Sequence, residues 1–242
     1  MTTPRPLAWK RSARLGVALL TVLGLSAVLA GCDPRALAYF LQPEDPSIAH
    51  DGPDLKGLRV VILTRASASA QSEVQAIDHD IAQELSTVLG KKVKKIELVP
   101  QSKVAAWVED HPNWTSPTEA AESFKADAVV AIEIQHYSIE NRKSPGLFEG
   151  TASIHVQVVK MLYPKDDRNR PDKSKPKEPE VVFEKTKEIS FPRLQGSMPL
   201  SAEVNRPAFL QKFLETVVTE ISWYFVNRGV GDTIQDTRFI TQ

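Results

Sequence analysis

The alternation of apolar and polar positions predicts strands in both halves of the chain. Residues 58–64 are almost wholly apolar and β-branched, which is typical of a strand covered on both faces. Residues 93–99 alternate Lys and Glu with apolar side chains, and 128–139 begin apolar and then alternate. Residues 151–162 alternate throughout and 181–191 can pair with them antiparallel. Five strands are therefore expected.

Helical spacing and capping signals predict four helices between and after these strands. Ser72 and Gln75 have the spacing of a capping box, and the helix that follows is expected to end at Gly90. A short helix is expected to begin at Ser102. The remaining two are predicted from Ser116-Pro117-Thr118-Glu119 and from Asn205, which precedes a wide apolar stripe.

This order of elements predicts an α/β (α+β) fold. The first strands are separated by helices, whereas the later ones can form a hairpin, so parallel and antiparallel pairs are expected in a single mixed sheet of about five strands. Helices should pack on the sheet, and a long C-terminal helix should cross it.

The N-terminal 31 residues have the three zones of an export signal. Arg5, Lys10, Arg11 and Arg14 precede a run of 16 uncharged residues, 15–30. That run is shorter than the roughly 20 residues of a membrane-spanning helix. A buried core helix or an uncleaved anchor are the alternatives. The run has no polar face, so a core helix would have to be buried on all sides.

Leu29-Ala30-Gly31-Cys32 resembles the lipobox of bacterial lipoproteins. The resemblance implies cleavage after Gly31 and a fatty-acylated Cys32. It also implies a protein held at the extracytoplasmic, periplasmic side of a cell membrane. Asp33 follows the cysteine, a position that sorts some lipoproteins to the inner membrane, and the choice between inner and outer membrane stays open.

The composition divides the remainder into a tether, a domain and a tail. Prolines and a glycine mark 32–56 as a tether, and 57–228 are expected to form the α/β domain. Within it, 163–180 are charged, proline-rich and free of aliphatic side chains, so a mobile insertion is expected. Residues 229–242 have neither period nor cap and are expected to be disordered.

The net charge of the chain and the spread of its basic residues disfavour some classes of binding partner. The chain has 30 Lys and Arg and 30 Asp and Glu residues. Four basic and no acidic residues fall within 1–31, so the mature chain carries 26 basic against 30 acidic residues, a net charge of −4. Neither a nucleic-acid partner nor a polybasic membrane patch is expected, because no clustered basic footprint is visible.

The sequence carries no recognised catalytic, metal or cofactor motif. None of the five histidines has metal-binding spacing, and GxSxG, P-loop and GxGxxG motifs are missing. Glu133, His136 and His155 form one polar group on neighbouring strands that could serve a hydrolase, although most such pairs are simply solvated strand positions. We expect no enzyme activity, no cofactor and no metal.

Aromatic residues mark candidate interface positions. Trp107 and Trp114 flank the turn between two short helices, and Trp223 begins three consecutive aromatics that close the last helix. Such side chains are enriched at protein interfaces. The alternative for Trp107 and Trp114 is a small satellite core beneath a loop.

The expected domain as a whole resembles an α/β fold shared by the TolB N-terminal domain, curli-secretion lipoproteins and penicillin-binding-protein activator lipoproteins. The resemblance covers about 58–228 and rests on element order, on Ala126-Asp127 before a buried strand and on the closing helix. His111-Pro112-Asn113-Trp114 and Ser222-Trp223-Tyr224-Phe225 also look like recurring segments of bacterial lipoproteins without assigned function. The charged insertion cannot enter a bilayer, which disfavours a pore.

We therefore expect a lipid-anchored, non-catalytic protein that binds or positions another envelope protein. The alternative is a sensor domain that binds a small molecule or glycan near the ends of the first and third strands, where α/β sheets often bind ligands.

Overall fold

The structure is a computed structural model that describes residues 47–141, 144, 146–164, 177–193, 197–199, 205–230 and 232. The expected signal peptide and Cys32 lie outside these residues. So do most of the tether, most of the charged insertion and most of the tail. Among the described helices, none is long and apolar enough to cross a membrane.

The main sheet of the described residues is mixed and has six strands, compared with the predicted five or so. Its strands run in the order β3 (Glu97–Leu98), β2 (Arg59–Ala66), β4 (Ala128–Glu140), β5 (Leu147–Leu162) and β6 (Glu178–Phe191), with β7 (Met198–Pro199) also paired to β5. β2 is parallel to β3 and β4, whereas the pairs formed by β5 are antiparallel. The predicted mixed α/β architecture is confirmed. The additional strand, β7, has only two residues, too few for any periodicity to reveal.

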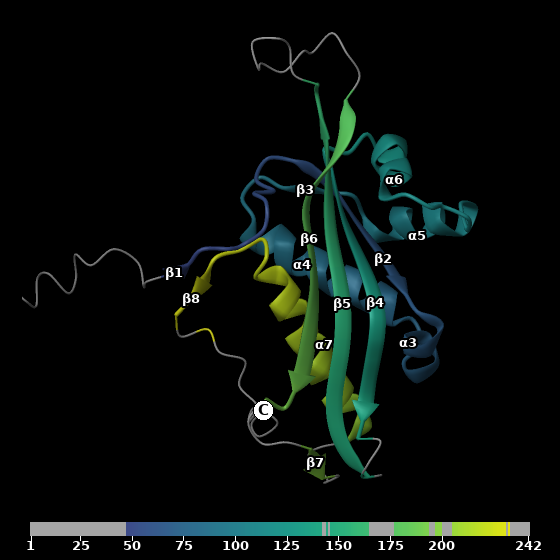
Figure 1. Ribbon diagram of the computed structural model, residues 1–242, viewed down its shortest axis with the longest axis vertical. Coiled ribbons are helices and arrows are strands. Elements are labelled where there is room, and N and C mark those ends of the chain that lie inside the picture. The colour runs from purple at the N-terminus through teal and green to yellow at the C-terminus, as the bar shows by residue number, and fades with distance from the viewer. Residues whose placement is uncertain are drawn as a thin grey trace, which may run out of the picture. The chain divides into compact units, whose positions relative to one another are not determined.

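Helices cover the two faces of the sheet unequally (Figure 1). The described helices are α3 (Ala68–Glu73), α4 (Ile77–Lys92), α5 (Gln101–Asp110), α6 (Pro117–Phe124) and α7 (Arg206–Ser222). α4 and α7 pack together behind the sheet in this view, and α5 and α6 lie on its other face beside β2 and β4.

The larger core fills the space between the sheet and the α4–α7 pair. Phe209 and Phe213 of α7 are fully buried, and Phe213 packs against Tyr137 of β4 with ring centroids 4.9 Å apart. Each such ring contributes about 1.5–3 kcal/mol through burial. Gly150 of β5 lets this helix approach, because a Cβ there would lie 2.6 Å from the Phe213 ring.

The helix predicted from Ser72 to Gly90 is wrong at both ends. Ser67 caps the short α3 instead, and α4 begins after Ala76, whose φ of 60° breaks the helical path. Gly90 lies within α4, since a single glycine costs a helix only about 1 kcal/mol and neighbouring contacts outweigh it. By contrast, the predicted caps at Ser116 and Asn205 are confirmed.

The strand predicted over 93–99 is reduced to the two residues of β3. Lys95 has a φ of 59°, a left-handed conformation that a strand cannot contain, and the chain turns there before joining the sheet edge. The lysines in this segment therefore belong to a turn rather than to a wet strand face.

The folded part extends beyond the predicted limits of 57 and 228. β1 (Ser47–Ile48) pairs antiparallel with β8 (Arg228–Gly229). Leu55 is fully buried and the Gly52 amide donates to the Tyr224 carbonyl oxygen at 2.9 Å. β6 likewise starts inside the expected insertion of 163–180. These segments are folded because they pair with residues far away in the sequence. Local composition does not indicate such pairing.

Candidate functional site

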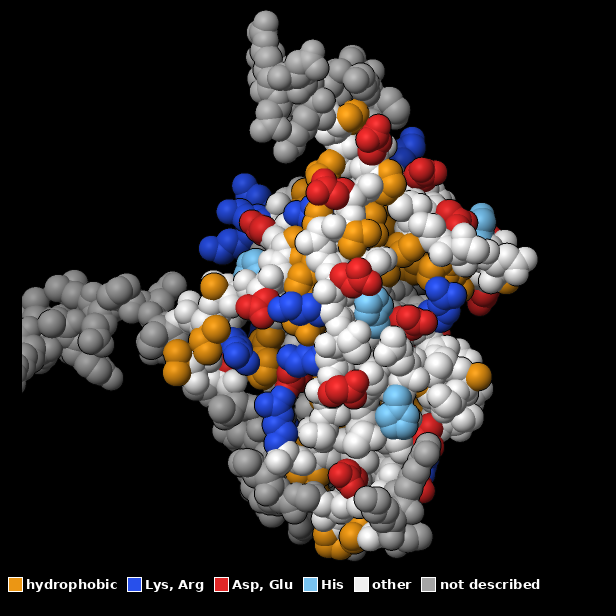
Figure 2. Space-filling model, in the orientation of Figure 1, with side chains coloured by type: hydrophobic (Ala, Val, Ile, Leu, Met, Phe, Trp, Pro, Cys, Tyr) orange, Lys and Arg blue, Asp and Glu red, His pale blue; other side chains and the backbone are white. Residues whose placement is uncertain are grey.

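One sheet face is covered only in part. α5 and α6 pack on the apolar residues Val61, Leu63, Val129 and Met161 and leave the rest of that face open. The open part consists of outward-facing positions of β4, β5 and β6 that alternate with core residues. We call this surface the open sheet face. Figure 2 shows it toward the viewer, with acidic and histidine side chains among other side chains and backbone drawn in white.

Cross-strand hydrogen bonds order the open sheet face. The two ring nitrogens of His155 lie 3.1 Å from Thr186 Oγ1 and 3.2 Å from Glu184 Oε1. Ser153 Oγ donates to Glu188 Oε1 at 2.6 Å. Pairs of this kind stabilise a sheet by about 0.2–1 kcal/mol each and hold the side chains in one arrangement.

A cleft lies where the open sheet face meets the segment before α6. Its volume is about 230 Å³, and its lining includes Arg65, Trp114, Glu133, His155 and Gln157. The Arg65 guanidinium carbon lies 4.4 Å from the centre of the Trp114 ring, a cation–π contact. Side chains from β2, β4, β5 and the loop before α6 thus converge on one hollow.

A helix cap fixes the Trp114 side of the cleft. Glu119 Oε1 accepts hydrogen bonds of 3.0 Å from the backbone amides of Thr115 and Ser116, and the Ser116 hydroxyl accepts from the Thr118 amide. The two backbone N–H groups, with that of Thr115 first, lower the pKa of Glu119 below its ordinary value. The loop carrying Trp114 is therefore held by the start of α6.

Three polar side chains in the cleft have hydrogen-bonding capacity to spare. Arg65, Glu133 and Gln157 form no hydrogen bond or ion pair with another described residue, apart from the cation–π contact of Arg65. Arg65 and Glu133 are register partners on β2 and β4. A guanidinium, a carboxylate and a carboxamide side by side suit a small polar ligand that both donates and accepts hydrogen bonds.

The polar group expected from Glu133, His136 and His155 is only partly assembled. Glu133 and His155 are opposite each other across β4 and β5, and both line the cleft. His136 is opposite Ser153 and contacts Thr151 Oγ1 at 3.2 Å, so it does not belong to the cleft lining.

The three candidate interface tryptophans occupy different surroundings. Trp107 is only 7% exposed and stacks on His111 at 4.7 Å between centroids, in the small core under α5 and α6. Trp114 packs against the same core and reaches the cleft. Trp223 packs against the larger core, with Arg228 4.8 Å from its ring centre. They do not form one patch.

Arg65 is the cleft residue that sequence reasoning placed differently. The first strand was expected to end at residue 64, but β2 continues through Arg65. Its signal was the alternation Val61, Leu63, Arg65, which puts all three side chains on one face.

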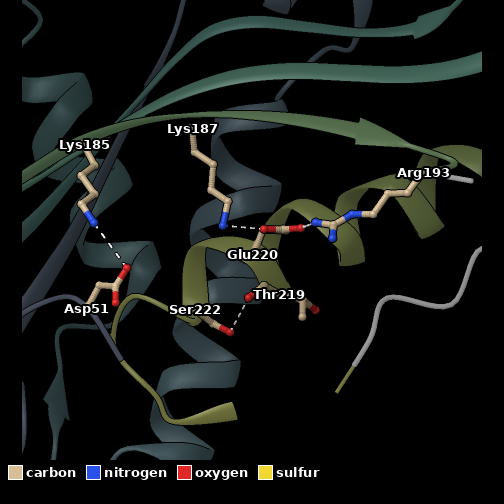
Figure 3. Close-up of polar contacts among 7 residues, drawn as sticks. All are labelled: Asp51, Lys185, Lys187, Arg193, Thr219, Glu220 and Ser222. Atoms are coloured by element: carbon tan, nitrogen blue, oxygen red, sulfur yellow. Dashed lines mark hydrogen bonds and ion pairs between the residues drawn. The ribbon is translucent and has the colours of Figure 1, made fainter. Parts of the chain in front are cut away.

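A second unexpected group lies at the other side of the sheet, between β6 and α7. Glu220 is 1% exposed, and its carboxylate is contacted by Lys187 at 2.5 Å and by Arg193 (Figure 3). Asp51 pairs with Lys185 nearby at 3.3 Å. These contacts fasten the edge strand β6 to the helical layer. Within the described residues, no three His, Cys, Asp or Glu side chains gather in a way that could hold a metal ion.

No protein-family model matches the chain. No curated protein matches it in sequence either.

Several solved structures are distantly similar to the chain. The PelC dodecamer from Paraburkholderia phytofirmans is 10% identical, with a TM-score of 0.39 over 76% of this chain and 97% of that one. Lipoprotein GNA1162 from Neisseria meningitidis is 12% identical, with a TM-score of 0.38 over 70% of this chain and 99% of that one. A putative neuraminyllactose-binding hemagglutinin homolog from Helicobacter pylori is 11% identical, with a TM-score of 0.33 over 73% and 89%. Likeness this distant assigns neither a family nor an activity, and the finer resemblance to TolB, curli-secretion and penicillin-binding-protein activator proteins stays a prediction.

Proposed function

We propose that the chain is a lipid-anchored, non-catalytic protein of the bacterial envelope that binds another envelope protein through the open sheet face. The ordered, partly uncovered sheet is the observation that carries this proposal. Hydrogen bonds such as Ser153 to Glu188 fix the outward side chains before any partner arrives. A preorganised surface loses little conformational entropy on binding, which favours a stable complex.

Two considerations favour binding over catalysis. Both ring nitrogens of His155 are engaged by β6 side chains, so neither is free to take a proton from a substrate. Among its described lining residues the cleft has no serine, cysteine or lysine, and the hydroxyl of its Thr115 donates to Glu119 Oε1 at 3.3 Å.

The anchor is proposed at Cys32, outside the described residues. Fourteen residues, 33–46, separate it from Ser47, where the folded part begins. Fully extended, that length spans at most about 50 Å. A domain on such a tether could meet partners within a narrow zone outside the membrane.

Site-specific photo-cross-linking in living cells tests the proposal. A photoreactive amino acid replaces Gln135 or Glu188 on the open sheet face, and Gln83 or Glu84, which are exposed on α4 on the opposite side, serve as matched controls. We expect one envelope protein to cross-link from both open-face positions and from neither control. The same products from all four positions, or none from any, would contradict the proposal.

The cleft supports a second candidate, the binding of a small polar ligand such as a saccharide. Arg65, Glu133 and Gln157, which have no hydrogen-bond or ion-pair partner among the described residues, carry it beside an aromatic ring. The test is thermal unfolding of the protein with a panel of mono- and disaccharides. A ligand at about 100 times its Kd adds about 2.7 kcal/mol of stability.

Matched variants make the ligand test specific. Arg65→Gln should abolish the rise in Tm, whereas Lys103→Gln on α5, away from the cleft lining, should preserve it. If no saccharide raised the Tm, or if both variants lost the rise equally, this second candidate would be rejected.

A further inference from the structure

Exposed lysines gather where the chain leaves α4. The group, which we call the lysine patch, is made of Lys56, Lys91, Lys92, Lys94 and Lys95. None of their ammonium groups forms an ion pair or hydrogen bond with another described residue. Lys56, Lys92 and Lys94 line one hollow of about 410 Å³. Figure 2 shows Lys and Arg side chains gathered at the upper left, where Figure 1 places the end of α4.

Nearby carboxylates do not cancel this charge. Asp54 is the acidic residue that lines the hollow. Glu97 is paired with Arg59. Asp51 is paired with Lys185. The lysine patch is therefore locally positive, although the mature chain is net negative. No clustered basic footprint was expected, yet four of the five lysines lie within residues 91–95, and the fold adds Lys56 to them.

The helix end explains only part of the lysine patch. Lys91 and Lys92 lie in the last turn of α4, where cations stabilise the helix by interacting with its dipole. Lys94 and Lys95 lie beyond that turn, and Lys56 belongs to another segment. These three charges have no such local role.

The chain enters the folded part beside the lysine patch. The same hollow is lined by His50 and Asp54, which follow Ser47 closely in the sequence. If Cys32 carries lipid, as the proposed function holds, residues 33–46 tether this entry side within about 50 Å of the bilayer. Opposite charge then attracts: each lysine near an anionic leaflet raises membrane partitioning about fivefold.

We propose that the lysine patch binds anionic phospholipid headgroups and so sets the orientation of the domain on the membrane. This inference rests on the anchor of the proposed function and adds a second contact with the same membrane. The proposed membrane contact does not depend on which protein binds the open sheet face.

The test measures lysine acetylation rates by mass spectrometry. The full, lipid-modified chain is reconstituted into vesicles of phosphatidylcholine alone or with phosphatidylglycerol. We expect the patch lysines to be acetylated at least about threefold more slowly on the anionic vesicles. Lys103 and Lys125, exposed on the α5 and α6 side, should react equally on both. About 0.5 M salt, which shortens the Debye length to about 4 Å, should remove the protection.

Charge-reversal variants sharpen the result. Lys92→Glu with Lys94→Glu should abolish the protection of Lys56, whereas the control Lys103→Glu with Lys125→Glu should retain it, with circular dichroism confirming that both fold. Equal acetylation on both vesicles by a chain that floats with them would overturn this inference and leave the anchor intact. A chain that floats with neither would overturn both.

Discussion

The ammonium nitrogen of Lys187 on β6 lies 2.5 Å from the carboxylate of Glu220 on α7. Glu220 is almost completely buried, and Arg193 is its other cationic partner. Burial, and then the charges of Arg193 and Arg228, lower the pKa of Lys187. The contact thus joins the sheet edge to the helical layer at an electrostatic cost that the carboxylates of Glu220 and Asp51 offset.

Removing Lys187 should therefore destabilise the protein more than an exposed ion pair would. For Lys187→Met we expect the free energy of unfolding to fall by about 2–3 kcal/mol. The buried Glu220 carboxylate would keep Arg193 but lose one of its two cationic partners. The double variant Lys187→Met with Glu220→Leu should recover most of that loss. Urea unfolding measures both, and a neutral single variant would show that the pair contributes nothing.

Gly150 should not tolerate a side chain. A Cβ there would lie 2.6 Å from the Phe213 ring, so Gly150→Ala forces α7 away from β5 and should cost about 1–3 kcal/mol. Gly90→Ala is the control: its nearest neighbour is Leu98 Cδ1 at 3.5 Å, and α4 should gain up to about 1 kcal/mol. Thermal unfolding of the two variants should give shifts of opposite sign.

Asp127 should make stability depend on acidic pH. Burial alone raises the pKa of this carboxyl, but hydrogen bonds from Lys177 at 2.6 Å and from the Arg59 amide at 3.0 Å lower it overall. Because the folded pKa lies below the unfolded value of about 4, the stabilisation is complete above that value and is lost as pH falls through the folded pKa.

The Asp127→Asn variant tests this. It should be less stable than the parent at pH 7, and the difference should shrink toward pH 3. Urea unfolding between pH 7 and pH 3 measures the difference in free energy of unfolding between the two proteins. A difference that stayed constant with pH would assign the effect to shape rather than to charge.

Ser116→Ala should weaken the loop that forms one side of the cleft. Its hydroxyl accepts from the Thr118 amide, and loss of such a cap costs about 1 kcal/mol. Hydrogen exchange should increase at residues 114–118 and stay unchanged in α4. If exchange were unaffected, the Glu119 contacts alone would be sufficient to hold the loop.

Local patterns predicted the elements whose signals are local. Alternating residues placed β4, β5 and β6 to within a few residues, and the side-chain caps at Ser116 and Asn205 begin α6 and α7. These features depend on period and on hydrogen bonds to neighbours in sequence, which can be read without knowing the fold.

Contacts between distant segments could not be predicted in this way. Ser72 and Gln75 match a capping box, yet Ala76 adopts a left-handed conformation that ends the preceding segment and restarts the helix. No residue near Glu220 in sequence shows that Lys187 and Arg193 will meet it. The cleft depended on Arg65 belonging to a strand rather than to the loop after it.

The pairing of β1 with β8 determines how tension on the N-terminal side would enter the domain. Only two residues of each strand are paired, so a pull would peel this ladder before it reached Leu55 in the core. Peeling from Ser47 to Leu55 would release about 25 Å of chain. Under mechanical load the tether would therefore lengthen while the six-stranded sheet stays folded.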